Sequence, residues 1–183
     1  MIHFTTVSNQ LELEGILSLQ AKNLPTNISE KEAKEQGFVT VQHDLELLSA
    51  MNHPYPHIIA KKNDHVVGYT LVMLPAFGNA IPILRPMFEK IDTLRFKNKP
   101  LMDTNYFVMG QVCVDKTCRR QGVFSGLYQQ MKEEMSSKFD CIITEVATRN
   151  IRSMNAHQHV GFEVINIYTV AEEEWAIVGW NWK

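Results

Sequence analysis

The most informative segment of the chain is Gln111-Val112-Cys113-Val114-Asp115-Lys116-Thr117-Cys118-Arg119-Arg120-Gln121-Gly122-Val123-Phe124-Ser125-Gly126. It begins in an apolar strand that we expect at 106–114, passes through a short polar loop, and ends in a helix. The helix is expected at 123–137, with one buried apolar face. That face consists of Phe124, Leu127, Tyr128, Met131 and Met135.

The sequence on either side of this segment predicts one mixed α/β domain over residues 1–183. A second strand is expected at 141–147, so that strand, helix and strand form a βαβ unit. A β-hairpin is expected at 58–74, with its turn at Lys62-Asn63-Asp64. The other predicted elements are helices at 8–22, 44–51, 82–94 and 150–159, a charged helix that opens at Ser29-Glu30-Lys31-Glu32 and ends at Gly37, and strands at 161–170 and 175–182.

Composition and charge exclude several classes of function. The 18 Lys and Arg residues against 20 Asp and Glu residues give a net charge of −2, which argues against a general nucleic-acid binder. The sequence contains no apolar run long enough for a membrane span, and the first residues lack the features of a secretory signal. The three cysteines, Cys113, Cys118 and Cys141, have no metal or redox spacing. We therefore expect reduced thiols, no metal site and a cytoplasmic protein.

The loop and helix start at 115–126 have the features of a diphosphate cradle. A helix N-terminus presents amide N–H groups without partners and the positive end of the helix dipole. Glycine at that place lets a phosphate approach the backbone, and Gly122 and Gly126 supply it. Arg119 and Arg120 add positive charge. The alternative is that the two glycines only shape a turn and a close helix contact.

A second group of polar residues lies downstream. Asn150, Ser153 and His157 share one face of the predicted helix because of their spacing. Glu145 lies near the carboxyl end of the preceding strand, where ligands tend to bind open α/β sheets. A carboxylate and an imidazole are therefore expected to reach one cleft. The alternative is a solvated helix whose histidine has only a structural role.

Together the two motifs resemble those of the GNAT superfamily of N-acetyltransferases. Residues 119–124 resemble that family's Arg/Gln-x-x-Gly-x-Gly/Ala motif, and Asn150 through Gly161-Phe162 is similar to its Asn-x-x-Ala-x-x-x-Tyr-x-x-x-Gly-Phe motif. A helix and a strand separate them, as the family requires. The resemblance implies a central, mixed, mostly antiparallel twisted sheet of about six to seven strands, flanked by helices. It also implies that two strands splay at the acetyl-CoA site.

The resemblance assigns a set of residues to acetyl-CoA, the implied co-substrate. Amides of the motif loop are expected to bind its pyrophosphate, and the end of the preceding strand its pantetheine arm. Asn150 matches a residue that contacts the pantetheine, and Ser153 takes the family's usual Ala/Ser position. The full set is Val112, Cys113, Val114, Arg119, Arg120, Gln121, Gly122, Val123, Phe124, Ser125, Gly126, Asn150 and Ser153.

The implied reaction is direct transfer of an acetyl group to a primary amine. An ammonium must lose a proton before it can attack. Glu145 is the expected base, and Gln111 with a water molecule is the alternative. A backbone N–H of the strand at 112–114 would stabilise the oxyanion. His157 stands where the family often has a tyrosine that protonates the leaving thiolate, and we expect it to act as the acid because histidine titrates near neutrality.

Three departures from the family pattern keep other functions open. Phe124 stands where Gly or Ala is usual, Val108 where some members carry a catalytic Glu, and His157 where Tyr is usual. They suit a non-catalytic acyl-CoA-binding sensor, and a phosphate-binding protein that uses the helix start alone is the remaining alternative. For an enzyme, the acceptor is an amine of a small molecule or a peptide. Dimers are common in the family, which leaves a homodimer open.

Overall fold

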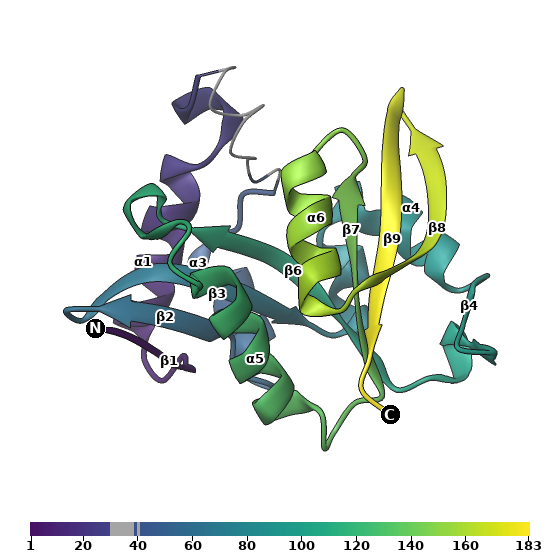
Figure 1. Cartoon of the computed structure of the whole chain (residues 1–183), viewed down its shortest axis with the longest axis horizontal. Coiled ribbons are helices and arrows are strands. Elements are labelled where there is room, and N and C mark those ends of the chain that lie inside the picture. Colours follow the sequence, from purple (N-terminus) through teal and green to yellow (C-terminus); the bar gives the residue numbers. More distant parts are fainter. Residues whose placement is uncertain (30–38, 40) are drawn as a thin grey trace. The chain divides into compact units, whose positions relative to one another are not determined.

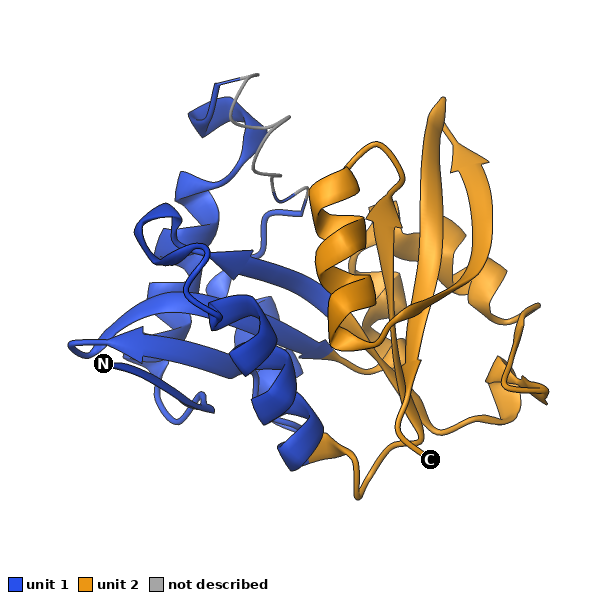
Figure 2. Ribbon diagram, in the orientation of Figure 1, with its two compact units in different colours: residues 1–72, 110–134 blue, residues 73–109, 135–183 orange. Residues whose placement is uncertain are grey.

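The computed structural model describes residues 1–29, 39 and 41–183. The chain forms two compact units (Figure 2): the first comprises Met1–Val72 and Gly110–Glu134, and the second comprises Met73–Met109 and Met135–Lys183. The charged helix predicted after Ser29, with its end at Gly37, lies outside the described residues. That residues 1–183 make one domain stays a prediction.

Seven strands form one mixed sheet, drawn as arrows in Figure 1. Their bounds are β1 Ile2–Thr6, β2 Ile58–Lys62, β3 His65–Met73, β6 Tyr106–Val114, β7 Cys141–Ala147, β8 Glu163–Val170 and β9 Glu173–Asn181. Their order in the sheet is β1-β2-β3-β6-β7-β9-β8. The pairs β1–β2, β2–β3, β7–β9 and β8–β9 are antiparallel, and β6–β7 is parallel. The predicted mixed, mostly antiparallel sheet is therefore confirmed.

The parallel pair is joined by helix α5 (Val123–Met135), which confirms the predicted βαβ unit. The ladder pairs residues 106–108 of β6 with residues 141–143 of β7. β6 continues to Val114 and β7 to Ala147. This short ladder is in keeping with the splayed strands that the family resemblance implies.

Helices α1 (Gln10–Lys22) and α3 (Leu45–Asn52) of the first unit both begin at a side-chain cap. The side chain of Asn9 accepts a hydrogen bond from the Glu12 amide, and that of Asp44 accepts one from the Leu47 amide. Each cap satisfies an amide that has no partner within its own helix. Both helices start within two residues of the predicted positions.

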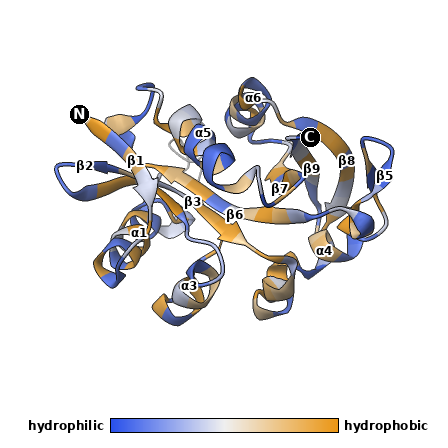
Figure 3. Ribbon diagram, turned by 90° about the horizontal axis from the view of Figure 1, so that it is seen from below, coloured by the Kyte–Doolittle hydropathy of each residue, from blue (hydrophilic) through white to orange (hydrophobic). Residues whose placement is uncertain are grey.

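Helices cover both faces of the strands in the first unit. Successive residues of a strand point to opposite faces. Gly68 of β3 faces α5, because a Cβ there would lie 3.2 Å from Leu127. The next residue, Tyr69, points to the opposite face, where Gln111 hydrogen-bonds both Tyr69 and Gln20 of α1. Figure 3 shows α1 and α3 on one side of these strands and α5 on the other.

Apolar side chains fill a core in each unit. In the first unit the fully buried residues include Ile16, Leu48, Met51, Ile59, Leu71, Leu127, Tyr128 and Met131. In the second they include Met87, Ile91, Phe107, Ile142, Ile143 and Ile177. The apolar face predicted for α5 is confirmed, except that Phe124 is only half-buried.

Short two-residue turns connect the antiparallel hairpins. The turn residues all have positive φ, as the commonest hairpin turn requires. They are Asn63 and Asp64 between β2 and β3, Lys97 and Asn98 between the short strands β4 (Arg95–Phe96) and β5 (Lys99–Pro100), and Ala171 and Glu172 between β8 and β9. The hairpin predicted at 58–74 is confirmed, with its turn where the sequence placed it.

The second unit contains two α-helices, α4 (Arg85–Ile91) and α6 (Ile151–Val160). The helix predicted at 82–94 is shorter than expected, because a 3-10 turn at Pro82–Leu84 leads into it. The other 3-10 turns are Pro25–Asn27, Pro75–Ala80, Leu101–Asp103 and Lys116–Cys118. None of the helices in the described part of the chain has the length and apolarity to cross a membrane.

Candidate functional site

The loop between β6 and α5 holds its shape through its own hydrogen bonds. Asp115 accepts hydrogen bonds from the amide and the hydroxyl of Thr117, at 2.9 and 2.7 Å. The side-chain amide of Gln121 donates to the Thr117 carbonyl oxygen over 2.9 Å. The amide of Asp115 donates to the Val67 carbonyl oxygen of β3 over 2.8 Å. The chain therefore arrives at the start of α5 in a fixed path.

Gly122 leaves the start of α5 open. Its φ is +75°, a region that favours glycine, and no described heavy atom lies within 4 Å of the position that a Cβ would take. The amide of Gly126 donates to the Gly122 carbonyl oxygen over 2.9 Å. By helix geometry, the amides before it in the first turn have no partner within the helix. Open space and amides without an acceptor inside the helix fit a diphosphate.

Gly126 has a different role from Gly122. A Cβ at Gly126 would collide with the ring of Phe4 on β1, and the Gly126 amide is already bonded within the helix. The Gly126 amide is thus used within the helix and its Cα packs closely against Phe4, so a contact of Gly126 with the co-substrate stays an untested prediction. Phe124 packs along the helix, with its ring centroid 5.0 Å from that of Tyr128.

The two arginines of the loop are used differently. Arg119 donates from Nε to the Val114 carbonyl oxygen over 3.1 Å and from Nη2 to Oδ1 of Asn23 over 2.8 Å. Arg120 is exposed and has a φ of +61°. Arg119 thus fixes the loop to the end of β6 and of α1, and Arg120 carries its charge in solvent, two residues before Gly122.

A buried polar network lies beneath the end of β6, around Gln111. Its Oε1 accepts hydrogen bonds from Nε2 of Gln20 and from the hydroxyl of Tyr69, both at 2.6 Å. Its Nε2 donates to the Val41 carbonyl oxygen over 2.8 Å, and Gln20 also bonds His43 Nδ1 over 2.8 Å. These bonds occupy Oε1 and one of the two N–H donors of Nε2, so one donor remains, and Gln111 with a water molecule stays an untested alternative to Glu145.

No sequence pattern identified Gln20, His43 or Tyr69 as members of this network. Gln20 and Tyr69 lie 91 and 42 residues from Gln111 along the chain, and no motif spacing links them. Burial lowers the pKa of His43 to about 4, so its ring is neutral at physiological pH. A neutral ring accepts the Gln20 hydrogen bond, which keeps the network intact.

The three cysteines of the chain are free and buried. Burial raises the pKa of the Cys113 thiol to about 12, with a smaller opposing effect from Arg119. Burial likewise raises the pKa of Cys141 to about 12. A thiol attacks as its thiolate, so neither side chain is set up as a nucleophile at neutral pH.

In the second unit, Glu145 on β7 accepts a hydrogen bond from the hydroxyl of Tyr168 on β8, with 2.5 Å between Oε2 and the hydroxyl oxygen. β9 lies between the two strands, and Glu145 is paired with its residue Ile177. Burial raises the pKa of Glu145, and the bond from Tyr168 acts in the opposite direction. Burial, followed by this bond, raises the pKa of Tyr168. Sequence analysis missed Tyr168.

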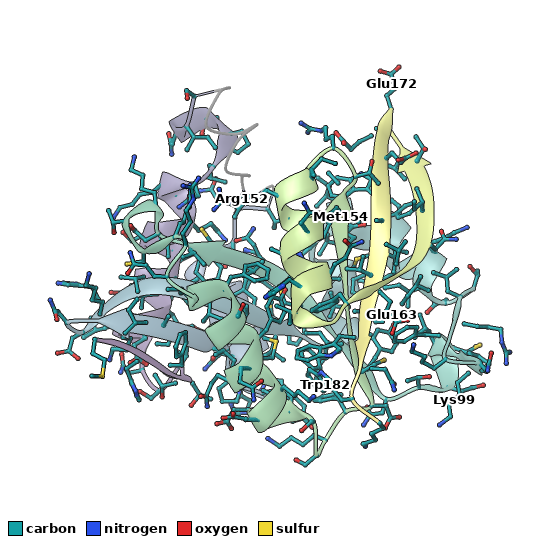
Figure 4. The ribbon with its side chains drawn as sticks, in the orientation of Figure 1. Lys99, Arg152, Met154, Glu163, Glu172 and Trp182 are labelled. Atoms are coloured by element: carbon teal, nitrogen blue, oxygen red, sulfur yellow. The ribbon has the colours of Figure 1, made fainter. Side chains whose placement is uncertain are left out.

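Asn150, Ser153 and His157 form one hydrogen-bonded chain at the start of α6. Asn150 is the N-cap rather than a helical residue, and its side chain accepts from the Ser153 amide over 3.1 Å. The carbonyl oxygen of Ser153 lies 2.8 Å from Nδ1 of His157. Because a carbonyl oxygen only accepts, Nδ1 carries the proton. Figure 4 labels Arg152 and Met154 on this helix.

The surroundings of His157 do not support its expected role as an acid. The side chain is 1% exposed, and the ring of Phe162 contacts its ring edge-on at 5.1 Å. Burial lowers the pKa of His157 to about 4, with a smaller opposing effect from Ser153. The ring is therefore neutral at physiological pH and does not titrate near neutrality, and the role of His157 as an acid stays an untested prediction.

No cluster of three or more His, Cys, Asp or Glu side chains suited to a metal ion occurs within residues 1–29, 39 and 41–183. Within the first unit the candidate site is the loop at Gly122. Within the second unit the candidate groups are the Glu145–Tyr168 pair and the cap of α6.

Residues 17–162 match the profile of the Acetyltransferase (GNAT) family. No curated protein matches the chain in sequence.

Several solved structures share the fold. The ribosomal-protein-S18-alanine N-acetyltransferase from Escherichia coli is 11% identical, with a TM-score of 0.63 over 99% of this chain and 94% of that one. A chain of the NatC complex, bound to Gag peptide and CoA, is 14% identical, with a TM-score of 0.66 over 98% of both chains. The yncA protein from Salmonella typhimurium, with its cofactor acetyl-CoA, is 12% identical, with a TM-score of 0.63 over 100% of this chain and 94% of that one.

Proposed function

Because the chain belongs to the GNAT acetyltransferase family, we propose that it moves the acetyl group of acetyl-CoA directly to a primary amine of a small molecule or a peptide. The observation that carries the proposal is the start of α5. Gly122 has a positive φ and open space where a side chain would be, and it precedes the first turn of α5, whose amides have no acceptor within the helix. We assign the co-substrate's diphosphate to the backbone of residues 121–125, with Arg120 as the neighbouring charge.

The strand end at 112–114 is proposed to serve the pantetheine arm and the reacting carbonyl. When the amine attacks, the thioester oxygen gains negative charge, which a backbone N–H can stabilise. The thiol of Cys113 is buried and its pKa is raised to about 12, so direct attack by the amine is favoured over an acyl-cysteine intermediate. Asn150 and Ser153 remain the proposed pantetheine contacts, through the polar groups at the start of α6.

Glu145 is the proposed base. It takes a proton from the acceptor ammonium, and the free amine then forms the new N–C bond while the C–S bond of acetyl-CoA breaks. The attacking nitrogen gives up its second proton to solvent as the amide forms, and CoA leaves as the thiolate, which takes a proton from solvent. Burial raises the pKa of the Glu145 carboxyl, which makes its carboxylate a stronger base than an exposed one. His157, with its neutral ring, is assigned to holding α6 and its cap in place.

Radiolabelled acetyl-CoA with a panel of amines tests this function. The panel holds peptides with free N-termini, a lysine peptide, a polyamine and an aminoglycoside. We expect transfer to one class, and a turnover number at least about 100-fold lower in Glu145→Gln, since a positioned base contributes that much. The affinity for acetyl-CoA should be unchanged in this variant. Tight binding of acetyl-CoA without transfer to any amine would favour the acyl-CoA sensor instead.

A further inference from the structure

Tyr168 is the only hydrogen-bond partner of the Glu145 carboxylate within the described residues. We propose that Tyr168 is a positioning residue for acetyl transfer, which holds Oε2 of Glu145 so that Oε1 takes the proton of the acceptor amine. This inference rests on the proposed function. Tyr168 keeps its own proton throughout: the proton moves from the ammonium to Oε1 and then to solvent, and the O–H bond of Tyr168 does not break.

The register of the sheet places the Tyr168 hydroxyl where it can hold the Glu145 carboxylate in one orientation. Glu145 is opposite Ile177 on β9, and Tyr168 is opposite Trp175 on the same strand. The tyrosine side chain therefore reaches diagonally across β9 to meet the carboxylate, over a distance of 2.5 Å between the two oxygens. Both side chains are half-buried. Each belongs to a strand that is hydrogen-bonded to β9 through its backbone. A carboxylate fixed in this way loses little freedom when the amine arrives.

The hydroxyl also counteracts the cost of burial. Burial favours the protonated carboxyl group, which cannot act as a base, and a hydrogen bond donated to the carboxylate favours the ionised form. Oε1 has no hydrogen-bond partner among the described residues, so one oxygen is supported and the other can accept a proton. Tyr168 thus keeps a half-buried carboxylate ready to act at neutral pH.

Among the described residues, only burial and the Tyr168 hydrogen bond shift the pKa of Glu145, and no neighbouring charge does so. Its neighbour across the ladder on β9, Ile177, is apolar. At the same end of the sheet, Arg149 and Glu173 pair with each other at 2.8 Å. On α6, burial keeps the pKa of His157 at about 4, so its ring is neutral. Replacing Tyr168 by Phe therefore removes the hydrogen bond to Glu145 without changing a neighbouring charge.

The first test compares the pH dependence of kcat/KM for wild type, Tyr168→Phe and a control, Thr169→Val, at the adjacent exposed position. Without the hydroxyl the pKa of Glu145 rises further, so the acidic limb of the Tyr168→Phe profile should move to higher pH. At pH 7 its kcat should be about tenfold lower, as for loss of a hydrogen bond to a charged group. At high pH kcat should recover toward wild type, and Thr169→Val should follow wild type throughout. A profile that keeps its position, even at lower kcat, would overturn the inference.

A second measurement does not need activity. Carbon-13 NMR of protein whose glutamate carboxyl carbons are labelled with carbon-13 follows the Glu145 carboxyl through its titration. The signal that is missing from the spectrum of Glu145→Gln is that of Glu145. We expect its midpoint at higher pH in Tyr168→Phe than in wild type. The same midpoint in both proteins would overturn the role of Tyr168, whatever the amine assays show. A shifted midpoint in a protein that transfers no acetyl group would instead contradict the proposed function.

Discussion

Arg119 donates a hydrogen bond from Nη2 to Oδ1 of Asn23, 2.8 Å away, and so ties the loop before α5 to the C-cap residue of α1. Asn23 in turn donates from Nδ2 to the Leu19 carbonyl oxygen over 2.9 Å. The loop that we assign to the diphosphate is therefore supported by a helix that precedes it by almost a hundred residues. Support of this kind keeps a binding loop in shape before its ligand arrives.

The two adjacent arginines should respond differently to replacement by alanine. Arg119→Ala removes hydrogen bonds to Asn23 and Val114, so urea unfolding should show a loss of about 2 kcal/mol in the free energy of unfolding. Arg120→Ala should leave that energy within about 0.5 kcal/mol of wild type. It should instead weaken acetyl-CoA binding several-fold, more so at low salt, as measured by calorimetry. Equal stability of the two variants would contradict the assignment.

Substitutions in the network around Gln111 should lower the free energy of unfolding in proportion to the number of hydrogen bonds that each one removes. Gln111→Leu leaves the Tyr69 hydroxyl, the Gln20 amide and the Val41 carbonyl without their partner, which should cost about 3 kcal/mol or more in urea unfolding. Tyr69→Phe removes one donor while Gln111 keeps its bond to Gln20, so about 1 kcal/mol is expected. A Gln111→Leu variant as stable as Tyr69→Phe would show that the network does not act as a unit.

The buried histidines predict a loss of stability in mild acid. The pKa of His57 is about 3 and that of His157 about 4 in the folded chain, against an ordinary value of 6.5, in each case because burial disfavours the charged ring. Below pH 6.5 the unfolded chain therefore binds more protons, and the free energy of unfolding falls as the pH drops toward 4. This stabilisation is fully present above pH 6.5.

Urea unfolding at pH 7.5, 6.0 and 5.0 checks this sign. Between its two pKa values, 6.5 unfolded and folded about 4 for His157 or about 3 for His57, each ring contributes at most about 3 and about 5 kcal/mol, respectively. His157→Phe should lose less stability between pH 6.0 and 5.0 than wild type, and His53→Phe, at an exposed position, is the matched control. Stability that stays constant from pH 7.5 to 5.0 would contradict the burial of these rings.

Local sequence patterns predicted the elements that carry the site. The strands at 106–114 and 141–147 and the start of α5 agree with the structure, because each combines an apolar run with a polar boundary. Gly122 could also be identified from the sequence, because it is a glycine that directly precedes a helix with an apolar face. β1 was missed because five residues with an irregular burial pattern give little periodicity. The β4–β5 hairpin has only two residues in each strand.

Side-chain pairs from distant segments could not be read from one sequence. Tyr168 meets Glu145 only because β9 lies between their strands, an order that is absent from the linear chain. The burial of His157 follows from packing against Phe162, which its helical spacing did not reveal. The close contact of Gly126 with Phe4 is another such pair, because the motif that contains Gly126 does not indicate its neighbour on β1.

The measurement that tests the central claim most directly is a calorimetric titration of the protein with acetyl-CoA. Wild type should bind in the micromolar range, about −8 kcal/mol. Gly122→Glu fills the open space with bulk and negative charge and should abolish binding. Leu11→Glu adds the same charge at a position on α1 that is 77% exposed, and it should bind like wild type. Failure of the wild type to bind acetyl-CoA, or undiminished binding by Gly122→Glu, would contradict the account.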